Sequence, residues 1–462
     1  MERKVPVWLL ALVVLIMLLF TAFFGWAVRS TMAGSDRSGA FGRGALAIAS
    51  FPGLVRLTLG DLSEQATGRG DRALAVLPAY DPAIPGLAPP AGADAAGLSG
   101  LRLVSRDGAI PGYRVLTGMF GVDDGSGAGD LFAHRSILLS PDMEIVRVWD
   151  LEDGLEVSGT DRNRAITHGF ALTEDLSPIY NLDGGNVIRR LGPCGGLIWE
   201  REGGYHHSVT IGPFDGRDVV WTLRSADEFE NKGFAALDLE TGEDLTSFTM
   251  GDLIEANPQT GAFEIRRSIN DWGATGNRRP HQVTWLKDPF HTNDIEALPA
   301  DRAGAFPGFE TGDVMISARS PNLVFVVDPE TLRLRWYSHG PWIRQHDPDW
   351  QPDGRITVFD NRMGRDFSEI RVIDPKSRAD GVMVDGAEMG FYTRIRGVHQ
   401  VLPGGNVLVS SPQQGRVFEV TPDGRVVLEI INQSTDGARS YNITSAHWLA
   451  PEDVPGDGRC PG

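Results

Sequence analysis

A histidine placed just ahead of a short β-type run recurs along this chain. The three clearest copies begin at His291, His346 and His399, at spacings of 55 residues (346 − 291) and 53 residues (399 − 346). A repeat of about 50 residues with Gly and Asp turns is typical of one blade of a β-propeller. Because equivalent positions of the blades surround one axis, the repeated imidazoles are predicted to gather around one central cavity.

Weaker copies of the same unit begin at His168, His207 and His447. The count of histidine-led units predicts six blades; seven is the alternative, because 84 residues separate His207 from His291. The 56 glycines, many in Asp-Gly and Gly-Gly pairs, supply turns for many short strands. The predicted fold class is all-β, a six-bladed β-propeller preceded by a single N-terminal transmembrane helix.

The N-terminal segment differs from the rest of the chain. Val5–Val28 is an almost unbroken apolar run of 24 residues, and at about 1.5 Å per residue it can span a bilayer core of about 30 Å. A cleaved signal peptide is the rival interpretation, but its apolar region is usually about 7–15 residues long. We therefore expect a transmembrane anchor at 1–30, a juxtamembrane segment and Pro/Ala/Gly linker at 31–111, and a β-propeller catalytic domain at 112–462.

Charge and cysteine content restrict the partners. A formal net charge of −18 argues against a nucleic-acid partner, and an anionic substrate would need a local positive cluster. Cys194 and Cys460 can pair in an oxidising compartment, where a bridge would fasten the tail to an early blade, or they can be two unrelated thiols.

A single histidine ahead of a buried strand is most often structural, but six in register favour a shared chemical role. The weaker flanking residues of His168 and His447 leave a structural role open for these two. Polar and cationic residues near the strong copies can supply a local positive field; they are Asn293, Asn361, Arg362, Arg365 and Arg396.

The runs HTNDIE, GDVMISARS, QHDPDWQPDGRITVFDNRMGR and VHQVLPGGNVLV, in this order, resemble the arylsulfotransferases. The resemblance covers roughly Tyr205 to Leu449. It implies a periplasmic six-bladed propeller enzyme that does not use phosphoadenosine phosphosulfate. In the implied ping-pong reaction, a histidine takes the sulfuryl group from a small aryl sulfate and passes it to a phenolic or other hydroxyl acceptor. Together with the apolar run, it implies a single-pass protein of a bacterial inner membrane with its catalytic domain in the periplasm.

The resemblance also implies roles for single residues. His399 is expected to be the nucleophile, His291 and Arg365 to bind the sulfuryl oxygens, and a protonated His346 to donate to the leaving phenolate. Substrate contacts are expected from Asn293, Arg362, Asn361, His207 and Arg396. No cofactor and no metal are expected. The better-known members carry an N-terminal β domain where this chain has an anchor and a linker, so the acceptor stays open.

Two other classes of function fit the same pattern. Three inward imidazoles with Asp294 or Glu296 can hold Zn²⁺ or Cu²⁺ with an open position, as in a metal-dependent lyase or hydrolase. A non-catalytic propeller anchored to the membrane as an assembly platform is the other alternative.

Overall fold

The computed structural model divides into two compact units. One comprises Met1–Gly70 and Ile265–Pro289, and the other Asp71–Glu264 and Phe290–Gly462. The residues that the structure describes are 6–32, 39–42, 44–45, 47–49, 74–75, 82–122, 131–155, 166–183, 187–224, 233–264, 289–434, 437 and 440–460. Much of the predicted juxtamembrane segment and linker lies outside these residues.

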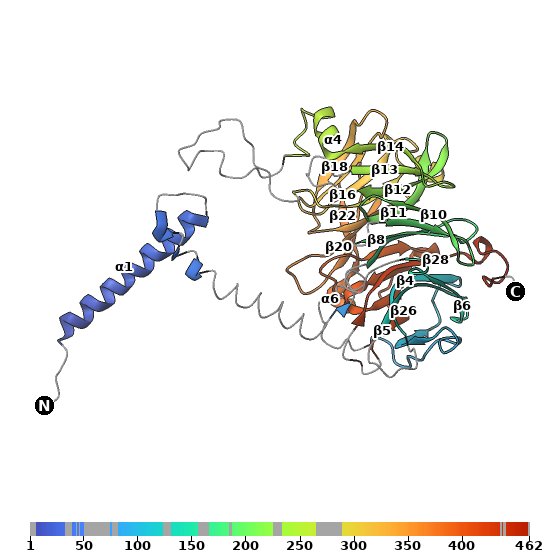
Figure 1. Ribbon diagram of the computed structural model, residues 1–462, viewed down its shortest axis with the longest axis horizontal. Helices are drawn as coiled ribbons and strands as arrows, with labels where there is room; N and C mark the ends of the chain where they lie inside the picture. The colour runs from blue at the N-terminus through green and yellow to red at the C-terminus, as the bar shows by residue number, and fades with distance from the viewer. Residues whose placement is uncertain are drawn as a thin grey trace. The chain divides into compact units, whose positions relative to one another are not determined.

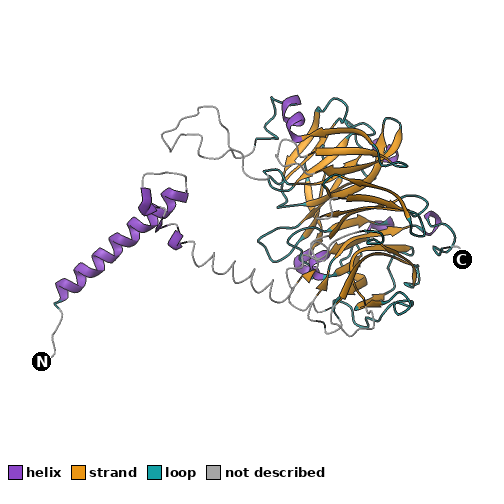
Figure 2. Cartoon of the chain, viewed as in Figure 1, coloured by secondary structure: helices purple, strands orange, loops and turns teal. Residues whose placement is uncertain are grey.

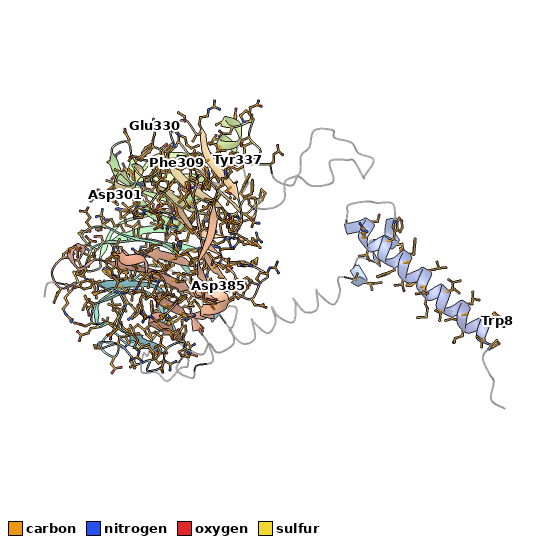
Figure 3. All side chains as sticks on the ribbon, turned by 180° about the vertical axis from the view of Figure 1, so that it is seen from behind. Trp8, Asp301, Phe309, Glu330, Tyr337 and Asp385 are labelled. Carbon is orange, nitrogen blue, oxygen red and sulfur yellow. A yellow bond between two sulfur atoms is a disulfide. The ribbon has the colours of Figure 1, made fainter. Side chains whose placement is uncertain are left out.

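The first unit contains one long helix, α1 (Val7–Met32). Its Val7–Ser30 stretch is long and apolar enough to cross a membrane, with a mean hydropathy of 2.9. Large apolar side chains such as Trp8 and Leu18 are exposed along it (Figure 3). The predicted N-terminal apolar helix is confirmed, and its length and composition are compatible with a membrane anchor and with a signal sequence.

The second unit is built from six antiparallel sheets arranged as blades (Figures 1 and 2). Blade 1 is β7 (Ile166–Leu172), β8 (Pro178–Asp183), β9 (Val187–Leu191) and β10 (Leu197–Glu202); blade 2 is β11 (Tyr205–Phe214), β12 (Arg217–Arg224), β13 (Gly233–Asp238) and β14 (Asp244–Thr249); blade 3 is β15 (Thr292–Ala297), β16 (Val314–Ala318), β17 (Leu323–Val327) and β18 (Leu334–His339). Blade 4 is β19 (His346–Trp350), β20 (Ile356–Asp360), β21 (Glu369–Ile373) and β22 (Asp380–Asp385); blade 5 is β23 (Val398–Val401), β24 (Val407–Ser411), β25 (Arg416–Val420), β26 (Val426–Asn432) and β3 (Leu101–Ser105); blade 6 is β28 (Ile443–Leu449), β4 (Tyr113–Val122), β5 (Leu131–Leu139) and β6 (Ile145–Asp150), with β2 (Leu98–Ser99) beside β4. The remaining elements are β1 (Leu74–Ala75), β27 (Ser440–Tyr441), the helices α4 (Met250–Ala256), α5 (Ala300–Ala303) and α6 (Gly386–Met389), and the 3₁₀ turns η4 (Pro403–Gly405), η5 (Pro412–Gln414) and η6 (Pro451–Asp453).

The histidine-led runs are the first strands of the blades, as the sequence predicts. β7, β11, β15, β19, β23 and β28 contact one another in turn and form a closed inner ring. The described strands make six blades, so the six-bladed prediction is confirmed. The long interval between His207 and His291 holds the rest of blade 2 and α4, and its residues 265–288 lie outside the described part.

The two ends of the propeller chain close the ring. The C-terminal strand β28 pairs with β4, and β3 pairs with β26 as a fifth strand, so part of the stretch predicted as a linker contributes strands to blades 5 and 6. A disulfide joins Cys194, between β9 and β10, to Cys460 near the C-terminus. This bridge fastens the tail that follows the closing strand.

The core lies between the blades, where both faces of the middle strands are covered. Every residue of β16, β17, β20, β24 and β25 is buried, which explains their nearly continuous β-branched and apolar sequences. Trp350 is fully buried between blades 3 and 4, with its ring 4.8 Å from Phe306 and 5.5 Å from Phe309 (centroid distances). Such packing holds the inner strands in fixed positions and makes the axis a rigid place for a site.

Candidate active site

A cavity of about 90 Å³ lies between the inner strands. Five of these strands carry a register shift near the histidine position, and the extra residues there face the cavity. The residues that line the cavity include His168, Gly169, His207, Ser208, Asn293, Asp294, His346, Asp347, Arg396, Gly397, Thr444, Ser445 and His447. The bulges therefore determine which side chains reach the axis.

Four imidazoles form a cluster at this cavity, and two of them, His168 and His207, line it. The ring of His207 lies 4.1 Å from that of His168, 4.8 Å from that of His206 and 5.2 Å from that of His291 (centroid distances). Burial, with the neighbouring imidazoles as a smaller cause, holds the pKa of His207 well below its usual range. The backbone is left-handed at His207 (φ 57°) and His291 (φ 47°), a strained conformation that clusters at functional sites.

His346 is the cavity histidine whose tautomer is fixed by its partners. The side-chain amide of Asn361 donates to the carbonyl oxygens of Thr393 (3.0 Å) and Arg396 (2.5 Å), so its Oδ1 must be the acceptor for Nδ1–H of His346 (2.6 Å). The lone pair of Nε2 then faces the backbone N–H of Arg396 at 3.2 Å. Burial, reinforced by the guanidinium of Arg319, holds the pKa of His346 well below its usual range. The neutral ring is thus favoured over the protonated acid that the resemblance implied.

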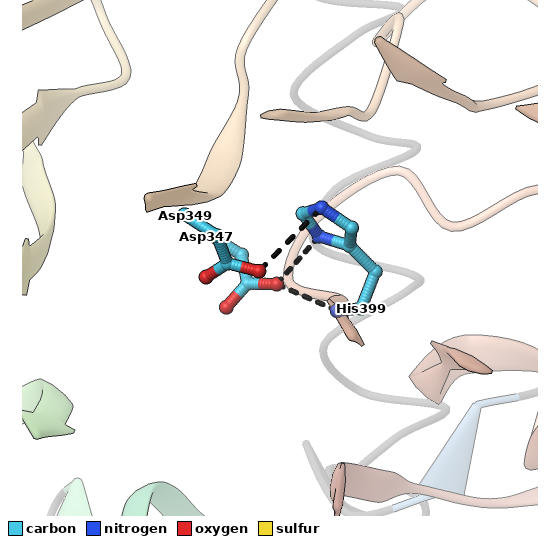
Figure 4. Close-up of side chains that lie close together, drawn as sticks. All are labelled: Asp347, Asp349 and His399. Carbon is cyan, nitrogen blue, oxygen red and sulfur yellow. Dashed lines mark hydrogen bonds and ion pairs between the residues drawn. The ribbon is translucent and has the colours of Figure 1, made fainter. Parts of the chain in front are cut away.

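His399 lies apart from the other histidines. Within the described part of the chain, its strand β23 is the only inner strand without a register shift, and Arg396, Gly397 and Val398 line the cavity there instead. The His399 side chain is fully buried, and its Nδ1 lies 2.8 Å from Asp347 Oδ2 (Figure 4). Its Nε2 lies 2.8 Å from Thr357 Oγ1. The structure therefore does not bring His399 into the cavity wall with the other imidazoles.

Four carboxyl groups cluster beside the histidines, on β15 and β19. Burial, followed by the charge of Asp347, raises the pKa of Asp294 well above its usual range. Burial raises the pKa of Glu296 to about 8. Burial, followed by the charges of Asp347, Glu296 and Asp294, raises the pKa of Asp349 well above its usual range. Sequence reasoning considered Asp294 and Glu296 only as metal ligands and missed Asp347 and Asp349. The signal was their alternation, in NDIE and HDPD, directly after the repeated histidine.

The predicted arginines divide into two groups. Arg396 lines the cavity. Arg365 is exposed, and Arg362 forms an ion pair with Glu369 and lies over the ring of Phe367, so neither is part of the cavity wall as described. Arg319, which sequence reasoning missed, is the cation that acts on His346. It occupies the SARS sequence that follows β16.

Asn293, for which a substrate contact is predicted, lines the cavity. Its side-chain nitrogen donates to the carbonyl oxygen of Gln345 (2.7 Å). Its Oδ1 is buried without a hydrogen-bond partner among the described residues, and Asn293 is only 5% exposed. A buried acceptor left unsatisfied costs free energy, so it marks a place where a ligand can bind.

A family model described as arylsulfotransferase (ASST) matches residues 187–433, more than half of the chain. The chain belongs to the arylsulfotransferase family. The matched residues span blades 2 to 5 and part of blade 1, and they include the cavity residues from His207 to Arg396. Arylsulfotransferase-like function on a propeller is therefore supported by the sequence family and by the fold.

The solved structures similar to this arylsulfotransferase-family chain have low sequence identity and low TM-scores, and no curated protein is significantly similar to it in sequence. A protein of unknown function from Bacteroides caccae has 14% identity and a TM-score of 0.42, over 69% of this chain and 93% of that one. TolB from Acinetobacter baumannii has 10% identity and a TM-score of 0.41, over 75% of this chain and 68% of that one. Virginiamycin B lyase from Staphylococcus aureus has 10% identity and a TM-score of 0.33, over 57% of this chain and 69% of that one.

Proposed function

We propose that this protein transfers a sulfuryl group from an aryl sulfate to a hydroxyl acceptor through a sulfohistidine formed on His346. One observation carries the proposal: in an arylsulfotransferase-family propeller, Asn361 fixes a buried cavity histidine with Nδ1 protonated, so that Nε2 carries the lone pair, which accepts only the backbone N–H of Arg396 among the described residues. A neutral imidazole in this tautomer is a competent nucleophile. The family resemblance assigns this role to His399, but both ring nitrogens of His399 are engaged outside the cavity wall.

In the first step, Nε2 of His346 attacks the sulfur atom of the aryl sulfate. The N–S bond forms with the imidazole lone pair, the S–O(aryl) bond breaks, and its electron pair leaves with the aryl oxide. The leaving oxide takes a proton from the carboxyl group of Asp294, which lines the same cavity. The backbone N–H of Arg396, which faces Nε2 in the free protein, is then able to donate to a sulfuryl oxygen.

In the second step, the hydroxyl oxygen of the acceptor attacks sulfur and the N–S bond breaks. The acceptor's proton passes to the carboxylate of Asp294, and Nε2 of His346 recovers its lone pair. The cavity thus returns to its starting state after each transfer. The two steps use the same groups in reverse order, as a ping-pong reaction between two hydroxyl compounds requires.

Charge on the sulfuryl oxygens needs donors that are already in place. Arg396 and the Arg319 side chain provide the positive field, and His207 and His168 provide further N–H groups around the cavity. One preorganised donor is worth about 3–4 kcal/mol in comparable oxyanion sites. These groups replace Arg365 and Arg362 in the roles that the sequence suggested.

The location of the reaction follows the N-terminal helix. We propose that α1 stays attached as a single-pass anchor of a bacterial inner membrane and that the propeller lies in the periplasm. The 24-residue length of the apolar stretch and the Cys194–Cys460 disulfide support this location.

The test uses the full-length protein in detergent with p-nitrophenyl sulfate, with and without phenol. Nitrophenolate release and the intact mass of the protein are followed for the wild type, His346→Gln, His399→Gln and the control His339→Gln on the outer strand β18. We expect phenol-stimulated release and a transient gain of one sulfuryl group, both lost in His346→Gln and kept in His339→Gln. An adduct that persists in His346→Gln and disappears in His399→Gln would return the nucleophile to His399. A folded wild type that forms no adduct and releases no nitrophenolate would contradict the function.

A further inference from the structure

The carboxyl cluster beside the cavity includes a group of side chains that can share one cation. The ligand atoms of Asp347, Asp349 and His399 all lie within 4.8 Å of one another (Figure 4). Ions bound at about 2.0–2.4 Å from each donor can bridge atoms at such separations. We propose that Asp347, Asp349 and His399 form a divalent-cation site in this propeller.

Asn293 provides an independent sign of a ligand at this place. Asn293 lines the same cavity as Asp347; its amide nitrogen is held by the carbonyl of Gln345, and its buried Oδ1 has no hydrogen-bond partner among the described residues. An amide oxygen is a good ligand for a hard cation, either directly or through a bound water. A cation at this cavity, or a water bound to it, would give that oxygen a partner.

The surroundings of His399 suit a metal-binding imidazole. Nε2 of His399 lies 2.8 Å from the hydroxyl of Thr357, which can accept Nε2–H and leave the Nδ1 lone pair for the ion. The backbone N–H of His399 donates to Asp347 Oδ2 (2.6 Å), which orients that carboxylate. Nδ1 of His399 and Oδ2 of Asp347 lie 2.8 Å apart, so both can bind one ion.

The ligand types indicate the class of cation. Two carboxylates and one imidazole combine hard oxygen donors with a nitrogen donor, a set that suits Mn²⁺ or Zn²⁺ better than Ca²⁺ or Mg²⁺. Such an ion offsets two negative charges in a cluster of four carboxyl groups. It would thereby favour the entry of an anionic sulfate ester, but its binding does not depend on the sulfuryl chemistry.

The test measures metal binding without any aryl sulfate. The full-length protein in detergent is stripped with a chelator and titrated calorimetrically with Mn²⁺, Zn²⁺, Ca²⁺ and Mg²⁺. Metal content after dialysis gives the stoichiometry. The variants are Asp349→Asn and His399→Gln, and the matched control is Asp353→Asn, an exposed carboxylate in the turn between β19 and β20. Asp349→Asn keeps the shape of the buried side chain, so we expect it to fold.

We expect one Mn²⁺ or Zn²⁺ per chain, with affinity at least 10-fold weaker in Asp349→Asn and His399→Gln and unchanged in Asp353→Asn. The absorption spectrum of bound Co²⁺ should change in His399→Gln, because an imidazole ligand is lost. No stoichiometric binding, or binding that both variants retain, would overturn the site. Binding of Ca²⁺ alone that His399→Gln leaves unchanged would overturn the ligand set. A wild-type protein that binds the metal ion but transfers no sulfuryl group would count against the proposed function only.

Discussion

The hydrogen bond between Asn361 and His346 is the contact whose removal tests the proposed chemistry most directly. Asn361→Ala removes the acceptor for Nδ1–H of His346 and two donor bonds to the carbonyls of Thr393 and Arg396. The imidazole is then free to protonate Nε2 instead, and that tautomer cannot attack sulfur. We therefore expect slower formation of the sulfuryl adduct with little change in the KM for the aryl sulfate.

The size of the effect follows from the hydrogen bonds. One neutral hydrogen bond contributes about 1 kcal/mol, which changes the ratio of the two tautomers about 5-fold. Loss of the fixed orientation of the His346 ring should slow adduct formation further. Replacing the charged group that orients the histidine of a catalytic triad lowers kcat about 10⁴-fold, and this value sets the upper limit. The expected decrease in the rate of adduct formation is therefore more than about 5-fold and less than about 10⁴-fold. Three lost bonds should also lower the free energy of unfolding by about 2–3 kcal/mol.

Ser368→Ala is the matched control. The Ser368 hydroxyl is buried beside Asn361, bonds to the carbonyls of Asn361 and Thr393 and accepts the N–H of Thr393, but it does not touch His346. It should cost comparable stability and leave adduct formation nearly unchanged. Rapid-mixing mass measurements on both variants, at a temperature where both are folded, separate the two effects. Equal rates of adduct formation in Asn361→Ala and Ser368→Ala would refute the positioning role.

Three further predictions concern the cavity and the ring closure. The pKa of Glu296 rises from 4.5 in the unfolded chain to about 8 in the folded one. The contribution of Glu296 to the free energy of unfolding is therefore complete below about pH 4.5 and is lost as the pH rises through 8. The free energy of unfolding should decrease by on the order of 5 kcal/mol over this range. Chemical unfolding in a chelator at pH 5, 7 and 9 should show a shallower decline for Glu296→Gln, and identical slopes would contradict the assignment. Arg396→Gln should lower kcat/KM for an anionic aryl sulfate about 10–100-fold, as expected for a charged hydrogen bond; the control is Arg365→Gln, which should have no effect. Replacing Cys194 and Cys460 with alanine opens a loop of 266 residues, which the chain-entropy model values at about 5 kcal/mol; an unchanged unfolding midpoint would show that the bridge does not constrain the chain.

The architecture could be predicted because the signal repeats. Each blade brings its own turn residues and buried strands, so the count of histidine-led units was sufficient to predict six blades and an inner histidine on each. Local sequence patterns control these features, and they do not depend on the direction of single side chains.

The direction of side chains at the axis could not be read from the pattern. A bulge shifts the alternation of a strand by one residue, and the inner strands of five blades have one where β23 has none among its described residues. His399 therefore leaves the cavity wall although its sequence position matches that of His346. Arg365, which was predicted to bind the sulfuryl oxygens, is exposed in the turn after β20 and is not among the described residues that line the cavity. Conversely, Asp347 follows a histidine directly and reaches the cavity only because the bulge turns it inward.

The energetic cost of these buried polar groups distinguishes the remaining interpretations. Asp294, Glu296 and Asp349 all have pKa values raised by burial, and Asn293 keeps an unpaired oxygen. Each of these lowers the stability of the folded chain relative to an apolar residue of similar volume. A propeller that served only as an assembly platform would gain stability by replacing them, since its contacts would lie on the outer surface. These groups lie together near the cavity, beside a histidine whose tautomer is fixed by Asn361. Their combined cost in stability favours a chemical function at this site over an assembly platform.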